Sequence, residues 1–353
     1  MSTIDRPRLD PGYRRHRLRC GPIAVAVRTR SLAVAAALLA AIAVLTIAAL
    51  GLGTYPLTPD AVLGTLFGGG DALDRTVVLE WRLPRTLAAC ALGALFAIAG
   101  ALFQTVTRNP LASPDVLGLS NGAFTGMLLT VVFFSASWPL MTAGSVVGGL
   151  ATAGLIWVLS RHGAGQSFRL IVIGIGVAAI LASANTWMLL EVELDTAMFA
   201  SAWGAGSLNG VTAGALGGAV VASLPLVLSL VLLTPRLRQL DLGDDVAHAS
   251  GAHPARTRAF SLLIAVGLVS IATAVAGPIA FIALAAPQIA RRLAGAPSLS
   301  LTLSALVGAF LLLASDVVAQ HVLPVTLPVG VVTVSVGGAY LVAVLIQEIR
   351  RRA

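Results

Sequence analysis

The sequence predicts an all-α, polytopic membrane protein. Of its 353 residues, 57% are hydrophobic and only 11% are charged, and the mean hydropathy is +0.92. Apolar runs recur at about the 20 residues that a helix needs to cross a bilayer, and arginines stand at their ends. A soluble domain of this length could not bury so much apolar surface, so we expect most of the chain to lie in a membrane.

The basic residues argue against two functions, ATP binding through a Walker A loop and nucleic-acid binding. All 23 are arginine, and a Walker A loop that binds ATP phosphates requires a lysine. Because the arginines flank apolar runs, we interpret the net charge of +8 as a topology signal and expect no nucleic-acid partner. The two cysteines stand in unrelated settings, and no metal site or disulfide is expected.

The first apolar run extends from Leu32 to Leu50 and follows eight arginines. A signal peptide is the alternative interpretation, but its apolar region spans only about 7–15 residues and ends at a cleavage site of small residues. We therefore expect residues 1–30 to form a mobile, basic cytoplasmic tail that anionic lipids attract. Residues 31–353 are then one transmembrane domain of ten helices.

The later spans follow from the lengths of the apolar runs. Thr58 and Pro59 predict a short external helix that stops at Gly68–Gly70. The 32 residues from Ala259 to Ala290 predict two shortened helices, broken at Gly277–Pro278. Twenty of the 23 arginines then lie inside, with both termini. The remaining spans are expected at Leu83–Thr107, Val116–Ser135, Pro139–Ser160, Leu170–Leu190, Val211–Leu233, Leu299–Val318 and Val329–Gln347.

The longest polar interruption of the chain runs from Asp241 to Arg258. Within it, Asp244 to Ser250 predicts a short helix that Gly243 opens and Gly251 closes. Four arginines nearby place it on the cytoplasmic side: Arg236, Arg238, Arg256 and Arg258. A helix this short is unstable alone, so we expect it to lie against another protein.

Other polar groups leave alternatives open. Asp316 is the one acid expected within a span, where it is by default functional or paired, although we favour a bond to neighbouring backbone or a place in a polar pore wall. The turn Asn109-Pro110-Leu111 is equally typical of a tight turn and of a stiff gate. Arg82 and Arg85 lie at the outer end of a span, where they either snorkel or meet an acidic partner. Pairs of small residues, such as Gly93 and Gly100, indicate close helix packing.

Five stretches together resemble the FecCD family of ABC importer permeases, whose members carry ferric siderophores, haem and cobalamin. They are EWRLPRTL, GALFQTVTRNPLASPDVLG, LGDDVAHASGAHPARTR, GPIAFIALAAPQIARR and LPVGVVTVSVGGAYLVAVLIQE. Residues 168–177 and 185–210 are most similar to members that carry ferric siderophores. The resemblance implies a type II ABC importer permease fold with ten helices, in which two groups of four form inverted repeats.

The resemblance also implies partners, a location and site residues. The partners are a second permease subunit, expected to be a non-identical homologue, two cytoplasmic ATPases that hold ATP and Mg, and an extracytoplasmic binding protein, at the bacterial inner membrane. Arg82 and Arg85 would dock the binding protein, although Gln320 replaces a third family arginine. Asn109 and Leu111 would form the cytoplasmic gate. Coupling to the ATPase would fall to Gly243, Asp244, Asp245, Ala247, Ala249 and Gly251.

We therefore expect an importer permease for ferric siderophores, with no catalytic residues and no cofactor of its own. Haem or cobalamin import is the alternative within the family. An ion-coupled carrier is disfavoured by the single intramembrane acid, and a membrane enzyme by the lack of a catalytic cluster. Gln104, Asn185 and Gln288, which replaces a family histidine, are candidates for lining the pore.

Overall fold

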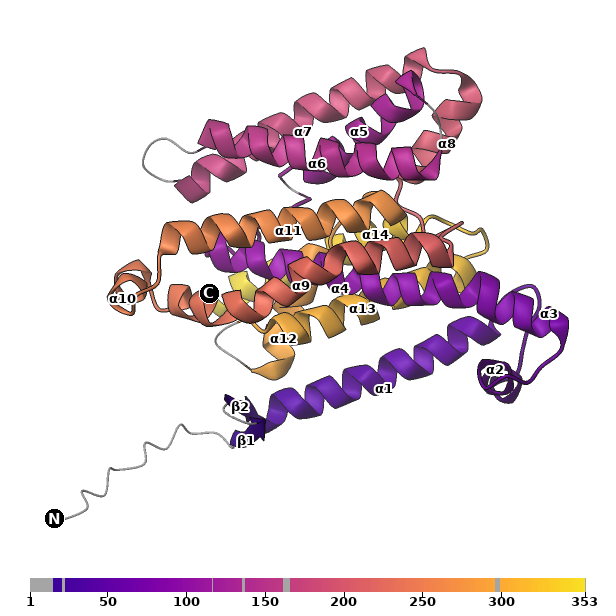
Figure 1. The fold of residues 1–353 in the computed structure, drawn as a ribbon, viewed down its shortest axis with the longest axis horizontal. Helices are drawn as coiled ribbons and strands as arrows, with labels where there is room; N and C mark the ends of the chain where they lie inside the picture. The colour runs from indigo at the N-terminus through magenta and orange to yellow at the C-terminus, as the bar shows by residue number, and fades with distance from the viewer. Residues whose placement is uncertain are drawn as a thin grey trace.

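The computed structural model describes residues 15–20, 23–115, 117–134, 137–160, 166–295 and 299–352. Helices dominate these residues and run mostly side by side (Figure 1). In chain order the elements are β1 (Arg15–Cys20), β2 (Ile23–Arg28), α1 (Thr29–Gly51), α2 (Pro59–Leu66), α3 (Ala72–Arg75), the π-helical η1 (Thr76–Arg82), α4 (Leu83–Thr107), α5 (Leu119–Phe133), α6 (Trp138–Ser160), α7 (Gln166–Glu191), α8 (Leu194–Gly204), α9 (Ala213–Asp241), α10 (Asp244–Ala249), α11 (Pro254–Ala276), α12 (Ile282–Ala294), α13 (Leu301–Val317), the π-helical η2 (Val318–Val322) and α14 (Val329–Arg352).

A helix occupies each of the ten positions predicted for spans, which are those of α1, α4, α5, α6, α7, α9, α11, α12, α13 and α14. Within the described residues, seven helical stretches are long and apolar enough to cross a membrane. The apolar parts of α5 and α14 are shorter, and α12 has only 13 residues. The multi-span helical fold is confirmed, and the count of ten crossings stays a prediction. Residues 116 and 135, the predicted ends of the third span, lie outside the described part.

The N-terminal region differs from the all-α expectation by one β-hairpin. β1 and β2 pair antiparallel, from Arg15 opposite Arg28 to Cys20 opposite Ile23. Arg28, the last residue of β2, donates from Nη1 to the Gly295 carbonyl at 3.0 Å, and Arg30, in the first turn of α1, donates from Nε to the Leu293 carbonyl at 2.8 Å. These carbonyls end α12 and would otherwise lack partners. The basic segment therefore caps a distant helix, and the rest of the predicted tail, residues 1–14 and 21–22, lies outside the described residues.

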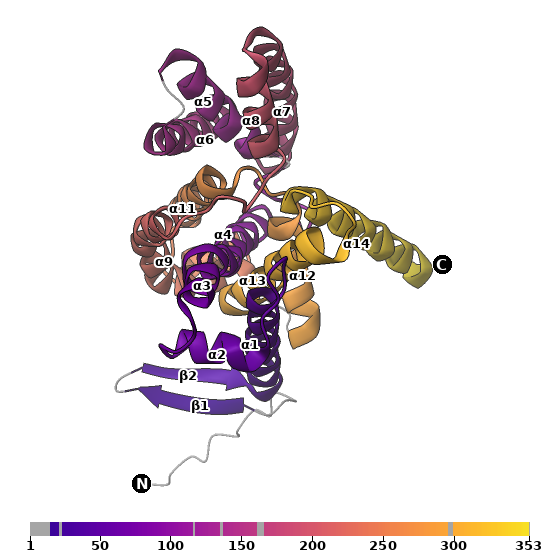
Figure 2. The same ribbon diagram turned by 90° about the vertical axis from the view of Figure 1, so that its right-hand side faces the viewer.

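α4 is the central helix, and it packs against α9, α11, α12 and α13 (Figure 2). The closest approaches use glycine, as predicted from the small-residue pairs. A Cβ atom on Gly93 would lie 2.4 Å from the Gly308 carbonyl oxygen of α13. A Cβ atom on Gly100 would lie 1.8 Å from the Ala283 carbonyl oxygen of α12. Backbones that approach this closely gain van der Waals contact, which is the main attraction between helices in lipid.

The predicted helix break is confirmed between α11 and α12. α11 ends at Ala276, and Gly277 and Phe281 adopt positive φ angles of 71° and 69°. Only α12 is shortened, because α11 begins in the polar segment at Pro254 and runs for 23 residues. The short helix predicted after Thr58 is also confirmed as α2, and its external side stays a prediction. Its start is capped by Thr58, whose hydroxyl accepts from the Ala61 N–H at 3.4 Å.

We expect the Gly100→Ala variant to lower the free energy of unfolding by ~1–3 kcal/mol, because the new methyl group would overlap the α12 backbone. Gly217→Ala on α9 is the matched control, since nothing lies within 4 Å of its added Cβ. Thermal unfolding of the purified protein in detergent measures both. If Gly100→Ala melts at the same temperature as Gly217→Ala, α4 and α12 can move apart without loss of stability.

Candidate functional site

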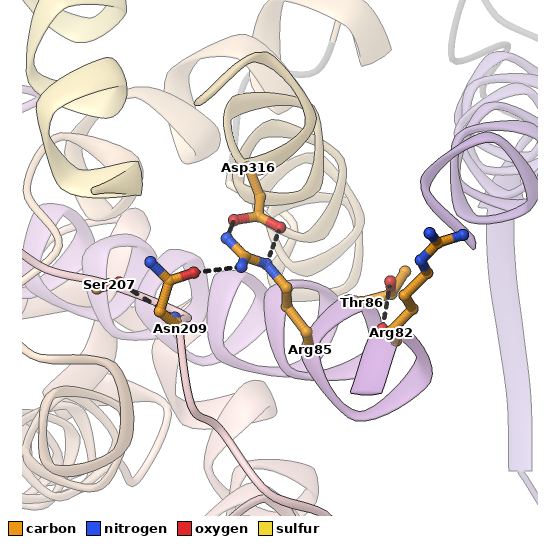
Figure 3. A network of polar contacts seen from close by, with 6 residues as sticks. All are labelled: Arg82, Arg85, Thr86, Ser207, Asn209 and Asp316. Atoms are coloured by element: carbon orange, nitrogen blue, oxygen red, sulfur yellow. Dashed lines mark hydrogen bonds and ion pairs between the residues drawn. The ribbon is translucent and has the colours of Figure 1, made fainter. Parts of the chain in front are cut away.

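The end of α4 that we expect on the outer side of the membrane carries a two-point ion pair. Arg85 Nε donates to Asp316 Oδ2 at 2.9 Å, and Arg85 Nη2 donates to Asp316 Oδ1 at 2.6 Å (Figure 3). The third arm of the guanidinium group, Nη1, donates to the side-chain oxygen of Asn209. The Arg85 side chain is 20% exposed and that of Asp316 is 8% exposed. A paired fork of this kind is among the stronger polar contacts in proteins.

This pair corrects our interpretation of Asp316. We favoured a bond to the backbone or a place in a polar pore wall, whereas the carboxylate meets a cation from another helix. A charge within an apolar bundle is stable only when it is compensated, and Arg85 compensates it. The two residues are 231 positions apart, so no local pattern joins them. The available signal was that each is unusual for its place, an acid within a span and an arginine at the outer end of one.

Arg82 points away from this pair, toward the end of α1 (Figure 3). Its Nη1 donates to the Leu50 carbonyl and its Nη2 to the Tyr55 carbonyl, both at 2.7 Å. Gly53 lies so close that an added Cβ would be 2.6 Å from the Arg82 guanidinium group. The two arginines predicted to dock a partner are therefore both bonded within the chain. Docking itself stays a prediction.

Asn209 connects the ion pair to other helices through the segment between α8 and α9. The Ser207 N–H donates to the Ala276 carbonyl at 2.7 Å, at the end of α11. The Gly330 N–H donates to the Gly206 carbonyl at 2.9 Å, at the start of α14. We define Arg85, Asn209 and Asp316 as the outer cluster. Through the segment around Asn209, this cluster is connected to the end of α8, the start of α9, the end of α11 and the start of α14.

A second cluster lies at the opposite end of α4. Arg108, the residue after α4, has a positive φ of 51° and directs Nη2 to the Leu240 carbonyl at 3.0 Å and to Asp244 Oδ1 at 2.6 Å. Arg258 Nη2 donates to the same Asp244 oxygen at 2.6 Å. The hydrogen bond from Arg258 and the charges of both arginines lower the pKa of Asp244. We call Arg108, Asp244 and Arg258 the inner cluster.

The inner cluster ties α10, the helix predicted for coupling, to α4 and α11. Gly243 and Gly251 flank α10 with φ of 110° and 80°, as its predicted opening and closing residues. Asp244 pairs with Arg108 and Arg258 of its own chain, and its role in coupling stays a prediction. Ala247 is fully buried, so it packs inward and is not part of the outer surface. Asp245 and Ala249 are exposed and remain available to a partner.

The predicted gate residues form a tight turn directly after Arg108. The Leu111 N–H donates to the side-chain oxygen of Asn109 at 2.9 Å, and Leu111 is 59% exposed. A few residues later, Asp115 Oδ2 accepts from the Phe281 N–H at 3.2 Å, just before α12. The turn interpretation is thus confirmed, and the gate role stays a prediction.

Two of the three candidate pore residues, Gln104 and Gln288, contact each other, and Asn185 lies in a separate network. Gln104 is 3% exposed, donates to the Leu284 carbonyl at 3.0 Å and accepts from Gln288 Nε2 at 2.5 Å. Asn185, also 3% exposed, accepts from the Thr125 hydroxyl at 2.7 Å and donates to the Asn121 carbonyl at 3.2 Å. These amides join helices to each other. Across the described residues, no three His, Cys, Asp or Glu side chains gather as metal ligands.

Comparison with known proteins identifies relatives over nearly the whole chain. The model of the FecCD transport family matches residues 38–347. The chain is 46% identical over 301 residues to the ferric enterobactin transport system permease protein FepG of Escherichia coli (strain K12), which covers 85% of this chain and 91% of that one. It is 35% identical over 336 residues to the permease protein FepD of the same organism and transport system, covering 94% and 98%.

A solved structure has the same fold. It is described as an inward-facing conformation of a metal-chelate type ABC transporter, and it superposes with a TM-score of 0.79 at 26% identity. The match covers 90% of this chain and 99% of the other. The helical arrangement described above is therefore that of a known class of membrane permease.

We expect Asp316→Asn to lower the free energy of unfolding by about 3–5 kcal/mol, because it leaves the largely buried Arg85 cation without its partner. The double variant Arg85→Gln/Asp316→Asn should be more stable than this single variant, since both charges are then absent. Asp71→Asn, at an exposed position, should change stability by no more than about 0.5 kcal/mol. Additive losses in the double variant, measured by thermal unfolding, would contradict the pairing.

Proposed function

The chain belongs to the FecCD transport family, and we propose that it is the transmembrane permease subunit of an ATP-driven importer that carries a ferric siderophore into the cytoplasm. The observation that carries this proposal is its 46% identity, over 85% of the chain, to a ferric enterobactin permease. The absence of lysine from the sequence fits a subunit that leaves ATP and Mg to separate ATPases.

The partner permease is proposed to be a non-identical homologue. FepG and FepD are two permease proteins of one ferric enterobactin system, and this chain is similar to both, at 46% and 35% identity. Two cytoplasmic ATPases and an extracytoplasmic binding protein complete the proposed importer. The distribution of arginines supports an inner-membrane protein with ten crossings and both termini inside, which places α10 in the cytoplasm.

Coupling is proposed to begin at the exposed surface of α10. Asp245 and Ala249 face outward there, and an ATPase groove would receive the helix through them. The inner cluster then provides the path into the membrane, because Asp244 binds both Arg108 at the end of α4 and Arg258 on α11. Arg108 directly precedes Asn109, so displacement of α10 would act on the turn that we propose as the gate. Movement of α10 would thus reach the turn through the ion pair of Asp244 with Arg108 and then through the peptide bond between Arg108 and Asn109.

Binding-protein docking is proposed for the outer face around Arg82 and Arg85. Their guanidinium groups are bonded to carbonyl oxygens and to Asp316, which orients them, and an incoming carboxylate would share these donors. For the pore, we retain Gln288 as the first candidate among the three predicted residues. Its side chain is partly exposed, whereas Gln104 and Asn185 are buried within the chain.

The experiment that tests the function is reconstitution in vesicles with the partner permease, the ATPases and the binding protein. A panel of ferric catecholate and hydroxamate siderophores, haem and cobalamin is supplied outside, and uptake is measured with and without ATP inside. We expect ATP-dependent uptake of a ferric siderophore. Uptake that follows a proton gradient without ATP would indicate an ion-coupled carrier, and uptake of haem or cobalamin alone would reassign the substrate.

For coupling, we expect Ala249→Trp to reduce uptake by more than about tenfold, because an indole group on the exposed face of α10 would prevent the helix from seating in the ATPase. Co-purification of the ATPase should fall in parallel, while association with the binding protein is unchanged. Ala213→Trp, an exposed alanine that begins α9, is the control. Normal uptake by Ala249→Trp would exclude this face of α10 as the ATPase contact.

A further inference from the structure

A cavity of about 490 Å³ lies between the group of α5, α6 and α7 and the neighbouring helices α4 and α11. These two groups are adjacent layers in Figure 1, where α6 lies beside α11. All the side chains that line the cavity are apolar. They belong to Phe103, Leu117, Leu119, Leu150, Ala153, Ile156, Trp157, Leu170, Ala259, Leu262, Leu263 and Val266, with Gly154 adding backbone.

The cavity occupies the half of the bilayer nearest to α10. It meets α11 from Ala259 onward, a few residues after that helix begins, and it meets α7 at Leu170, near its first turn. On α6 it reaches Trp157, close to the last residue Ser160. Trp157 is 48% exposed, and tryptophan is enriched at the level of lipid headgroups. In the orientation proposed above, this is the cytoplasmic leaflet.

The lining residues on α11 form one helical stripe that ends at a cation. Ala259, Leu262, Leu263 and Val266 repeat at the spacing of a single face. One turn before Ala259 on the same face stands Arg256, which is exposed. Within the described residues Arg256 has no hydrogen-bond or ion-pair partner, whereas Arg258 is paired with Asp244. An apolar slot therefore leads to an unpaired positive charge at the membrane surface.

The chemistry of the slot selects its occupant. Water is not stable there, because ordered water needs two or more polar partners and the walls offer apolar side chains. A charged iron complex is excluded for the same reason. Hydrocarbon is the matching component at this depth, and an arginine at the headgroup level attracts an anionic lipid. We propose that the cavity binds one acyl chain of an anionic phospholipid, with the phosphate group at Arg256.

Bound in this way, the lipid would fill the space between the two helix groups that line the cavity. The site is separate from the outer cluster, the inner cluster and the proposed gate. Only the choice of leaflet depends on the proposed function, through the orientation of α10. Loss of lipid binding and loss of siderophore uptake can therefore be distinguished, because the first is measured without substrate or ATP.

Gly154 offers a variant that fills the cavity. A Cβ atom added there has nothing within 4 Å, so the phenylalanine of Gly154→Phe can enter the slot without displacing the chain. Gly217→Phe on α9 is the matched control, because the Cβ there also has nothing within 4 Å and Gly217 does not line the cavity. Both variants add the same apolar surface to a membrane helix, and only one competes with an acyl chain.

The experiment uses the full-length chain reconstituted in nanodiscs of equal phosphatidylglycerol and phosphatidylcholine, and retained lipids are counted by native mass spectrometry after release into mild detergent. We expect the parent protein to retain phosphatidylglycerol preferentially. Gly154→Phe should retain on the order of tenfold less, since excluding about two methylene groups suffices for that factor. Gly217→Phe should resemble the parent. Equal retention in all three proteins would overturn the proposal.

Arg256→Gln tests the headgroup contact and does not alter packing, so it remains informative if Gly154→Phe fails to fold. We expect the preference for phosphatidylglycerol to fall about fivefold while total lipid is retained, which corresponds to the loss of one arginine near the surface. Arg236→Gln, at an exposed position on α9, is the control and should leave the preference unchanged. An unchanged preference in Arg256→Gln would contradict lipid as the occupant. So would a loss of association with the partner permease that is seen in Gly154→Phe alone.

Discussion

A charge within an apolar bundle must be compensated, and this requirement determines how α4 is held. At its outer end Arg85 pairs with Asp316, and just past its inner end Arg108 pairs with Asp244. Between these points the helix is almost entirely buried and approaches α12 and α13 through Gly100 and Gly93. Each ion pair joins α4 to a segment more than 130 residues away, so the central helix links parts of the chain that the sequence separates.

The two clusters differ in ways that suit different tasks. The outer pair is largely buried and uses a two-point fork, which resists displacement because breaking it strands a charge. At the inner cluster, Arg108 and Asp244 are 50% and 40% exposed, and one carboxylate oxygen serves two arginines. Water can replace these contacts at little cost. A rigid outer end and an adaptable inner end would let a displacement of α10 reach Arg108 and the turn after it while the outer network stays intact.

The sequence predicts what depends on local chemistry. Apolar run lengths predicted the positions of the helices, Gly277 and Pro278 predicted the break, and Thr58 predicted the cap of α2. The β-hairpin was missed because Arg15–Cys20 is mostly basic, which is typical of a solvated tail. The apolar run Ile23–Val27 is too short to distinguish a strand from other structure. The partners of Asp316 and Asp244 were missed because pairing across the chain leaves no periodic trace. Likewise, the burial of Ala247 depends on how α10 turns against its own chain.

The broken helix and the proposed gate turn are one mechanical unit. Asp115 follows the turn at Asn109 by six residues, and its carboxylate accepts the N–H of Phe281, the residue just before α12. Phe281 in turn fills the space beside Gly337 of α14, where an added Cβ would lie 2.3 Å from the Phe281 side chain. Gly277, at the other side of the break, touches the Trp203 carbonyl oxygen too closely for any side chain. A shift of Asp115 would therefore either carry the start of α12 with it or break the hydrogen bond of a carboxylate whose other oxygen has no partner among the described residues, which is costly.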